Sequence, residues 1–133
     1  SIARTVTSLR WITDIPETPI SVLGNDLRFE QMLDKLLDNA SDFTTEGGVI
    51  TVGLSDHINS VVLWVENEGP SLHIQDGVDA FQMFSGTRND STGSHLGLGL
   101  YVVRLIAESM GARVAIGNTQ RGVRVEVTGI RVP

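Results

Sequence analysis

Residues 26–43 read DLRFEQMLDKLLDNASDF and predict the first long helix of the chain. The apolar residues of this stretch recur at helical spacing and so share one face of a helix: Phe29, Met32, Leu33, Leu36, Ala40 and Phe43. Asn25 or Asp26 is a suitable N-cap, because a short polar side chain satisfies free backbone N–H groups and an acidic residue suits the positive end of the helix dipole. A helix with one apolar face packs against a second layer.

Strands are predicted on both sides of this helix. After a turn at 45–48, residues 50–54 alternate between apolar and polar or small side chains, as in a half-buried strand. Residues 60–65 form a continuous apolar run and predict a central strand. Before the helix, residues 9–13 and 20–23 are candidate short strands.

The second half of the chain contains a further predicted helix followed by two predicted strands. Residues 99–110 return to helical spacing, and Gly111 is a good stop for that helix. Residues 114–116 and 123–127 are predicted strands, and a short helix is predicted near 74–80.

The predicted elements come in the order strands, helix, two strands, loop, helix, two strands. Strand and helix do not alternate strictly enough for a doubly wound parallel sheet. We therefore predict an α+β fold, a two-layer α/β sandwich in which helices pack on one face of a mixed β-sheet. No repeat and no Pro-rich linker interrupts the sequence, so residues 1–133 are expected to form a single domain.

The composition excludes several classes of function. Ten Lys and Arg stand against sixteen Asp and Glu, so the net charge of −6 gives no general affinity for nucleic acid or an anionic membrane. There is no cysteine, which excludes a disulfide scaffold, a thiol nucleophile and a cysteine metal site. No apolar run approaches the roughly 18 residues of a membrane helix, and Ser1–Thr7 is not a signal peptide. We expect a cytoplasmic domain without nucleic-acid partners or direct membrane contact.

The most specific local feature is Leu96-Gly97-Leu98-Gly99-Leu100, directly before the second helix. Glycines at a helix N-terminus let backbone N–H groups approach a phosphate, and the helix dipole favours the negative charge. The structural alternative is a tight loop whose glycines pack against a strand. The stretch is neither a Walker A loop nor a Rossmann fingerprint, because the spacing differs and no Gly-Lys-Ser/Thr follows.

Polar side chains at two other places could serve the same ligand. Lys35, Asn39 and Asp42 line one flank of the first predicted helix, with Asn39 at the edge of the apolar face. Together they could hold a metal ion and phosphate oxygens, although a solvated flank is the plain alternative. At residues 65–70, VENEGP, a predicted strand ends in polar residues. A side-chain amide there can read a base edge by hydrogen bonds, or the segment is only a strand-to-loop exit.

In their order along the chain, these stretches resemble the ATP-binding catalytic domain of sensor histidine kinases, within the group that includes gyrase, Hsp90 and MutL. Residues 33–40 resemble the asparagine box, residues 67–70 the first glycine box, and residues 95–103 the second glycine box. Residues 81–88, FQMFSGTR, resemble the phenylalanine box that opens the ATP lid. The resemblance runs from about Ile20 to the end of the chain and implies the α/β sandwich predicted above.

The resemblance implies a role for each matching residue. Asn39 would coordinate the Mg²⁺ that bridges the phosphates, and Phe43 would lie beside the adenine ring. Asn67 would face the exocyclic amine of adenine, and Gly69 would let the base approach the backbone. The glycines of the second glycine box would hold the phosphates. Lys35 and Asn39 form the implied catalytic pair, and the implied ATP-binding set is Asn39, Asp42, Phe43, Asn67, Gly69, Phe84, Arg88, Leu96, Gly97, Leu98, Gly99 and Leu100.

Four positions depart from the family pattern. Lys35 stands where an earlier asparagine is common, Asn67 where Asp is usual, Ser71 in place of a later glycine, and His95 in place of the first glycine of the second box. These departures motivate a second interpretation, a degenerate module that only binds nucleotide or a partner protein. A third, an anti-sigma-factor-type serine kinase, shares the fold, but residues 96–106 match the histidine kinase form more closely.

The histidines bear on the partners of the domain. His57, His73 and His95 lie in predicted turns or loops, and none occupies an early helix followed by an acidic residue, as a phospho-acceptor would. The resemblance thus implies a histidine kinase domain that uses Mg²⁺ and ATP, with its acceptor histidine on a separate dimerisation domain and a response regulator as a further partner. The chain alone is not expected to phosphorylate itself.

Overall fold

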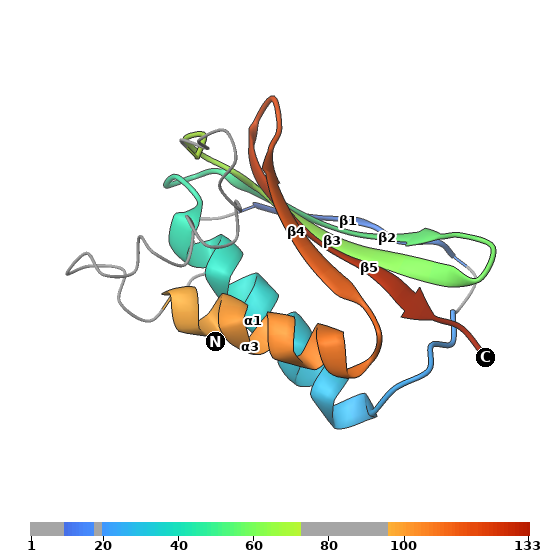
Figure 1. Ribbon diagram of the computed structural model, residues 1–133. Helices are drawn as coiled ribbons and strands as arrows, with labels where there is room; N and C mark the ends of the chain where they lie inside the picture. The colour runs from blue at the N-terminus through green and yellow to red at the C-terminus, as the bar shows by residue number, and fades with distance from the viewer. Residues whose placement is uncertain (1–9, 18–19, 73–95) are drawn as a thin grey trace.

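The computed structural model describes residues 10–17, 20–72 and 96–133 (Figure 1). Its strands are β1 (Arg10–Asp14), β2 (Val49–Asp56), β3 (Ser60–Glu68), β4 (Arg113–Asn118) and β5 (Gly122–Arg131). Its helices are α1 (Asp26–Phe43) and α3 (Leu96–Ser109). The strands form one 5-stranded sheet in the order β1-β2-β3-β5-β4.

The sheet is mixed, because β1 runs parallel to β2 while every other neighbouring pair is antiparallel. Helices α1 and α3 lie side by side on one face of the sheet (Figure 1). The opposite face is covered by no helix or strand of the described residues. This arrangement confirms the predicted two-layer sandwich. Strand β3 is the middle strand of the sheet, as the apolar run at 60–65 predicted.

Helix α1 begins and ends at the predicted residues. Asn25 is the N-cap, and its Oδ1 accepts a hydrogen bond from the backbone N–H of Arg28 at 3.0 Å. At the other end, the N–H of Thr44 donates to the carbonyl of Ala40 at 3.0 Å. Both signals are local in sequence, and for that reason periodicity and capping chemistry located this helix.

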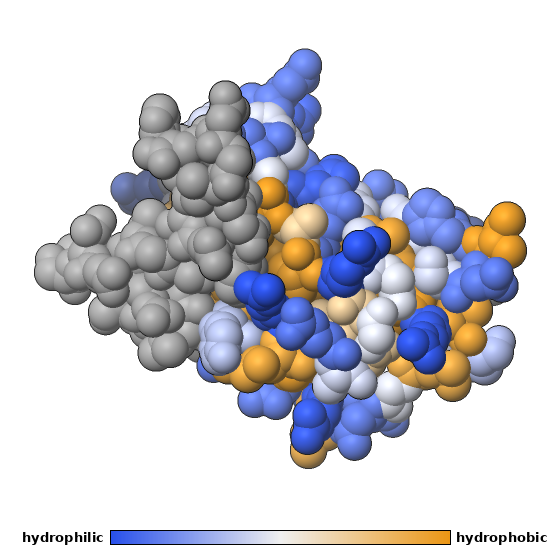
Figure 2. Space-filling view, in the orientation of Figure 1, coloured by the Kyte–Doolittle hydropathy of each residue, from blue (hydrophilic) through white to orange (hydrophobic). Residues whose placement is uncertain are grey.

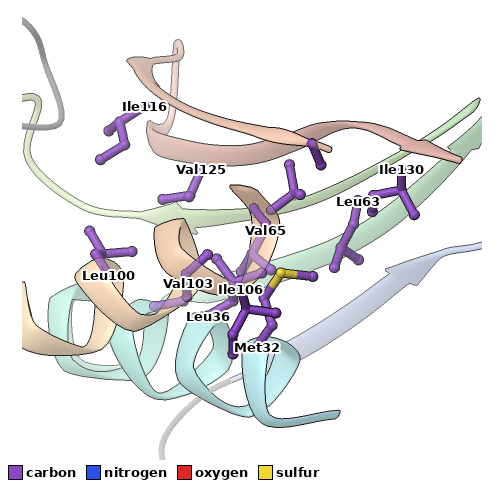
Figure 3. Close-up of a cluster of buried hydrophobic side chains, with 14 of the residues drawn as sticks. Met32, Leu36, Leu63, Val65, Leu100, Val103, Ile106, Ile116, Val125 and Ile130 are labelled. Carbon is purple, nitrogen blue, oxygen red and sulfur yellow. The ribbon is translucent and has the colours of Figure 1, made fainter. Parts of the chain in front are cut away.

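The core lies between the sheet and the two helices and is almost wholly aliphatic (Figure 3). Met32 and Leu36 of α1 and Val103 of α3 are at most 1% exposed. They pack in one cluster with sheet residues such as Val65. Full burial of one such side chain stabilises the folded state by about 1.5–3 kcal/mol.

Two predictions about secondary structure are wrong. Helix α3 begins at Leu96, three residues before the predicted start at Gly99, so Gly97 also lies in its first turn. Residues 20–23 form no strand. They have the alternating exposure of one, but their only described backbone bond to the sheet joins the N–H of Leu23 to the carbonyl of Arg131 at 2.8 Å.

The remaining predictions agree with the structure or fall outside the described residues. Gly111 terminates the helix as predicted. It follows the last turn of α3 and has a φ of +75°, in the left-handed region that favours glycine. The predicted strand at 9–13 corresponds to β1, shifted by one residue. The short helix predicted near 74–80 lies outside the described residues.

A stack of side chains that the sequence did not predict occupies the helix-free face of the sheet. The ring of Trp64 lies over Gly53 on β2, where an added Cβ would stand 2.0 Å from ring atoms. The guanidinium of Arg124 lies 4.0 Å from the Trp64 ring centroid, and its Nε donates to Glu66 Oε1 at 3.1 Å. Trp64 is therefore only 8% exposed although no helix covers it.

Apolar residues on the surface are scattered between polar ones over the face in view (Figure 2). Leu27 on α1 and Ile58 in the turn after β2 are the most exposed of the large apolar side chains, at 75% and 94%. Neither described helix is long and apolar enough to cross a membrane.

Candidate functional site

The buried amide of Asn39 is the most unusual polar group on α1. Asn39 is 4% exposed, and its Oδ1 has no hydrogen-bond partner among the described residues. The sequence placed Asn39 at the edge of the apolar face, and the structure corrects this, because packing against the rest of the fold buries it. A buried oxygen without a partner costs about 1–3 kcal/mol, so it calls for an explanation, of which a bound ion or water is one.

Lys35 lies one turn before Asn39 and is half-buried. Its Cδ is the one atom found within 4 Å of the place where a Cβ on Gly99 would stand, at 3.9 Å. The aliphatic stem of Lys35 therefore runs beside the first turn of α3, where a glycine leaves room for it. This contact joins the asparagine box to the second glycine box.

Asp42 and Phe43 complete the flank of α1 but differ in burial. Asp42 is exposed, whereas Phe43 is half-buried and packs against the core. The three residues of the predicted flank therefore differ in exposure to solvent: Asn39 is buried, Lys35 is half-buried and Asp42 is exposed. A uniformly solvated flank, the plain alternative, does not describe it.

The end of β3 lies against the end of α1. The N–H of Thr45, just after α1, donates to the carbonyl of Glu68 at 3.1 Å. A Cβ on Gly69 would stand 3.0 Å from the carbonyl oxygen of Phe43, a distance at which a side chain has little room. The first glycine box is thus held close to the helix that carries Asn39, and Gly69 suits this close approach.

Asn67 is buried on the helix-facing side of β3. It is 4% exposed, and its side chain has no described hydrogen-bond partner. Its neighbours Glu66 and Glu68 point to the opposite face by strand alternation. The bond between Glu66 and Arg124 on the helix-free face confirms this for Glu66. An amide with free donors and an acceptor is therefore available at the helix side of this strand end.

The N-terminus of α3 presents backbone N–H groups. A helix that begins at Leu96 leaves the N–H groups of its first residues, 96–98, without intrahelical acceptors. Its first turn contains no acidic residue that would compete for them. Leu100 contributes differently, because its side chain is fully buried in the core (Figure 3).

Two predicted site residues, Phe84 and Arg88, lie outside the described residues, and so do the loop histidines His73 and His95. His57 is exposed, and its N–H donates to the carbonyl of Ser60 at 2.9 Å in the turn between β2 and β3, as expected for a surface histidine. In the described part of the chain, no group of three or more His, Asp or Glu could hold a metal ion.

One polar contact near this site was not predicted from the sequence. Asn118, the last residue of β4, bonds through its side chain to both backbone groups of Leu72. The two residues are 46 positions apart, so no local pattern could have paired them. The polar Asn118 after the apolar and small residues 114–117 was the only sequence signal.

Comparison with known proteins identifies the family of the chain. Residues 24–132 match the family model of the histidine kinase-, DNA gyrase B- and HSP90-like ATPases. Sensor protein ChvG of Agrobacterium fabrum is 36% identical over 105 residues, which cover 77% of this chain and 18% of ChvG. The chain therefore spans about a fifth of the length of this curated relative.

Solved structures with the same fold include two histidine kinase domains. The nucleotide-free catalytic domain of histidine kinase ThkA superposes with a TM-score of 0.74 at 24% identity, covering 94% of this chain and 81% of that one. The mycobacterial sensor histidine kinase MprB superposes with a TM-score of 0.75 at 19% identity, covering 99% and 93%. The family match, which spans most of the sequence, shows that the chain belongs to the histidine kinase-, DNA gyrase B- and HSP90-like ATPases, as the catalytic ATP-binding domain of a sensor histidine kinase.

Proposed function

We propose that this chain binds Mg·ATP and that its parent protein transfers the γ-phosphoryl group to a histidine on a separate dimerisation domain. The observation that carries the proposal is the Oδ1 of Asn39, which is buried and lacks a described partner on a helix that packs beside the first turn of α3. The N–H groups of residues 96–98, which have no intrahelical acceptors, and the stem of Lys35 at Gly99 lie at the same junction of α1 and α3. This combination offers a cation ligand and phosphate donors together.

The residues present fit a magnesium ion. Mg²⁺ prefers oxygen ligands and usually takes one or two from the protein and the rest from waters and phosphates. The amide oxygen of Asn39 meets that requirement without a cage of carboxylates. When bound, the ion would neutralise part of the charge on the phosphates, which matters for a chain with a net charge of −6.

The chain's own groups would bind the rest of the nucleotide. The N–H groups at 96–98 would donate to phosphate oxygens at the positive end of α3. Lys35 would add a direct phosphate contact where relatives commonly have asparagine. Asn67 and Gly69 would receive the base, with Phe43 beside it. Arg88, Phe84 and Asp42 remain proposed contacts that rest on the resemblance.

The reaction needs little covalent chemistry from the protein. The bond between the γ-phosphorus and its bridging oxygen breaks, a bond to an imidazole nitrogen of the acceptor histidine forms, ADP leaves, and the imidazole proton passes to water or a base. Catalysis of such transfer is mainly positioning and charge neutralisation. A response regulator would then receive the phosphoryl group on the cytoplasmic side.

Labelled ATP tests the proposal directly. The chain incubated with Mg²⁺ and γ-labelled ATP should accumulate no phosphohistidine. Addition of the dimerisation domain of its own parent protein should give acid-labile label on that domain, because proximity is what the chain alone lacks. A dimerisation domain whose acceptor histidine is replaced by alanine is the matched control. If ATP binds but the intact dimerisation domain is never labelled, the chain is the degenerate module.

A further inference from the structure

Residues 69–72, which we call the strap, leave the end of β3 and cross to the tip of the β4–β5 hairpin. The N–H of Gly69 donates to the carbonyl of Arg121 at 3.1 Å. At the far end of the strap, the N–H of Leu72 donates to Asn118 Oδ1 at 2.7 Å, and Asn118 Nδ2 donates to the carbonyl of Leu72 at 2.9 Å. The hairpin thus holds the strap at both ends.

The bond pair between Asn118 and Leu72 has the form of a strand pairing. One side-chain amide satisfies the donor and the acceptor of the same backbone residue, which fixes direction as well as distance. The side chain of Leu72 is half-buried and packs against the core. Two hydrogen bonds and one apolar contact therefore fix the position of Leu72.

The hairpin tip is itself tightly built. The N–H of Thr119 donates to the carbonyl of Gly122 at 2.8 Å, and Thr119 Oγ1 accepts from the N–H of Gly122 at 3.1 Å. A Cβ on Gly122 would stand 2.0 Å from the backbone oxygen of Asn67, so only a glycine fits there. The tip is thus a rigid support packed directly against the backbone of Asn67.

Asn67 and Asn118 lie in one row across the sheet. Val123 of β5 pairs with Asn67 on one side and with Asn118 on the other. The three side chains therefore point to the same, helix-facing side of the sheet. Asn67 and Asn118 are two strand spacings apart, about 10 Å. The strap starts beside the first residue of this pair and ends on the second.

We propose that Asn118 is a positioning residue for the base end of the nucleotide site, a role that rests on the function proposed above. Asn118 holds the strap against the hairpin tip so that Gly69 keeps its close approach to α1 and Asn67 keeps its orientation before nucleotide arrives. Nothing in the proposal requires Asn118 to touch the nucleotide.

The physical reason is preorganisation. A segment that is already in its bound conformation need not be ordered when the ligand binds, so less of the binding free energy is lost. If the strap were released from Asn118, it would become ordered only when nucleotide binds, and the entropy lost in ordering it would weaken binding. The described hydrogen bonds of the strap go to the hairpin tip and none goes to Asn39 or to residues 96–98, so the loss should fall on the base.

The test compares the original chain with Asn118→Leu, which keeps the size of the side chain and removes both bonds, and with Asn118→Ala as a second variant. Gln120→Ala, an exposed change on the same turn, is the matched control. Three quantities are measured well below the unfolding temperature: the exchange rate of the Leu72 amide proton, the Kd of Mg·ATP, and the Kd of Mg·tripolyphosphate, which has no base.

We expect faster exchange at Leu72 and a rise of about 3- to 10-fold in the Kd of Mg·ATP in both Asn118 variants. The Kd of Mg·tripolyphosphate should not change, and Gln120→Ala should alter none of the three quantities. A purely structural role for Asn118 would lower the unfolding temperature and leave the ratio of the two Kd values unchanged. That result would overturn the proposal, and so would unaltered exchange at Leu72.

Failure of the proposed function has a different signature. If the proposed function is wrong, the original chain itself, without any substitution, does not bind Mg·ATP. The positioning role then falls with it, while exchange at Leu72 still reports whether the contact with Asn118 exists.

Discussion

The Cδ of Lys35 lies 3.9 Å from the position that a Cβ on Gly99 would occupy, and among the described residues it is the one atom outside the neighbouring stretch of chain found within 4 Å of that position. The distance is an ordinary van der Waals contact, so an alanine at 99 fits without strain. The relationship makes the packing of α1 against the first turn of α3 testable by substitution.

Gly99→Ala should therefore stabilise the free protein. Residue 99 is helical, and alanine in place of glycine within a helix is favoured by about 0.5–1 kcal/mol. Urea unfolding of the original and the variant measures the difference. A loss of stability would mean that residue 99 is not helical in solution or that the space beside Lys35 is filled.

Lys35→Met should weaken Mg·ATP binding by about tenfold, because methionine keeps the aliphatic stem beside Gly99 and removes the charge that a phosphate oxygen would accept from. Adenosine, which has no phosphate, should bind the two proteins equally. Competition titration with both ligands measures the effect. Gln31→Met, an exposed change on the same helix, is the control and should alter neither Kd. Equal loss for adenosine would show that Lys35 acts through the fold and not through the phosphates.

Asn67→Asp should raise the preference for ATP over GTP. A carboxylate accepts a charge-assisted hydrogen bond from the adenine amine and repels the O6 of guanine, whereas an amide can rotate and donate to that oxygen. The gain for ATP is of order 1 kcal/mol, or several-fold in Kd. The nucleotide-free protein should at the same time lose about 1–3 kcal/mol of stability, because a carboxylate would be buried where Asn67 is 4% exposed.

Dissociation constants for ATP and GTP, measured for both proteins, give the ratio. Glu66→Gln is the matched control, since Glu66 lies on the opposite face with Arg124 and should leave the ratio unchanged. An unchanged ratio in Asn67→Asp would remove Asn67 from base recognition.

Gly53→Ala and Gly117→Ala form a matched pair on the sheet. A Cβ at 53 would collide with the ring of Trp64 at 2.0 Å, whereas a Cβ at 117 would meet no atom of the described residues within 4 Å. Gly53→Ala should cost about 1–3 kcal/mol through overpacking and should change the fluorescence of Trp64 as the ring is displaced. Gly117→Ala should leave stability within about 1 kcal/mol of the original. If both substitutions cost the same, the ring of Trp64 does not lie over Gly53.

Local signals explain which parts of the fold could be predicted from the sequence. Both ends of helix α1 could be predicted to the residue, because its N-cap at Asn25 and the spacing of its apolar residues lie within one short segment of sequence. The sequence predicts the start of α3 three residues too late, because the low helix propensity of glycine at 97 and 99 favours a loop before a helix. In the structure both glycines lie in the first turn of α3, and residue 99 is in ordinary van der Waals range of Lys35.

Long-range packing explains what could not be predicted at the site. The burial of Asn39 depends on elements far along the chain that pack on α1, so helical periodicity alone placed it at an edge. The pairing of Asn118 with Leu72 depends on the register of β3, β5 and β4. The stack of Arg124 on Trp64 depends on that same register. Motif resemblance supplied Asn67 and Gly69 but held no information about what supports them.

We attribute the burial of Asn39 Oδ1, which has no hydrogen-bond partner among the described residues, to a role as a ligand for Mg²⁺. Titration calorimetry of ATP into the original chain and Asn39→Ala, each with and without Mg²⁺, tests it most directly. We predict that Mg²⁺ tightens ATP binding in the original and has no such effect in Asn39→Ala, so that the variant binds Mg·ATP at least about tenfold more weakly. Its unfolding free energy should hold or rise, since an unsatisfied buried oxygen has been removed. Mg²⁺ enhancement of equal size in a folded Asn39→Ala protein would contradict the account.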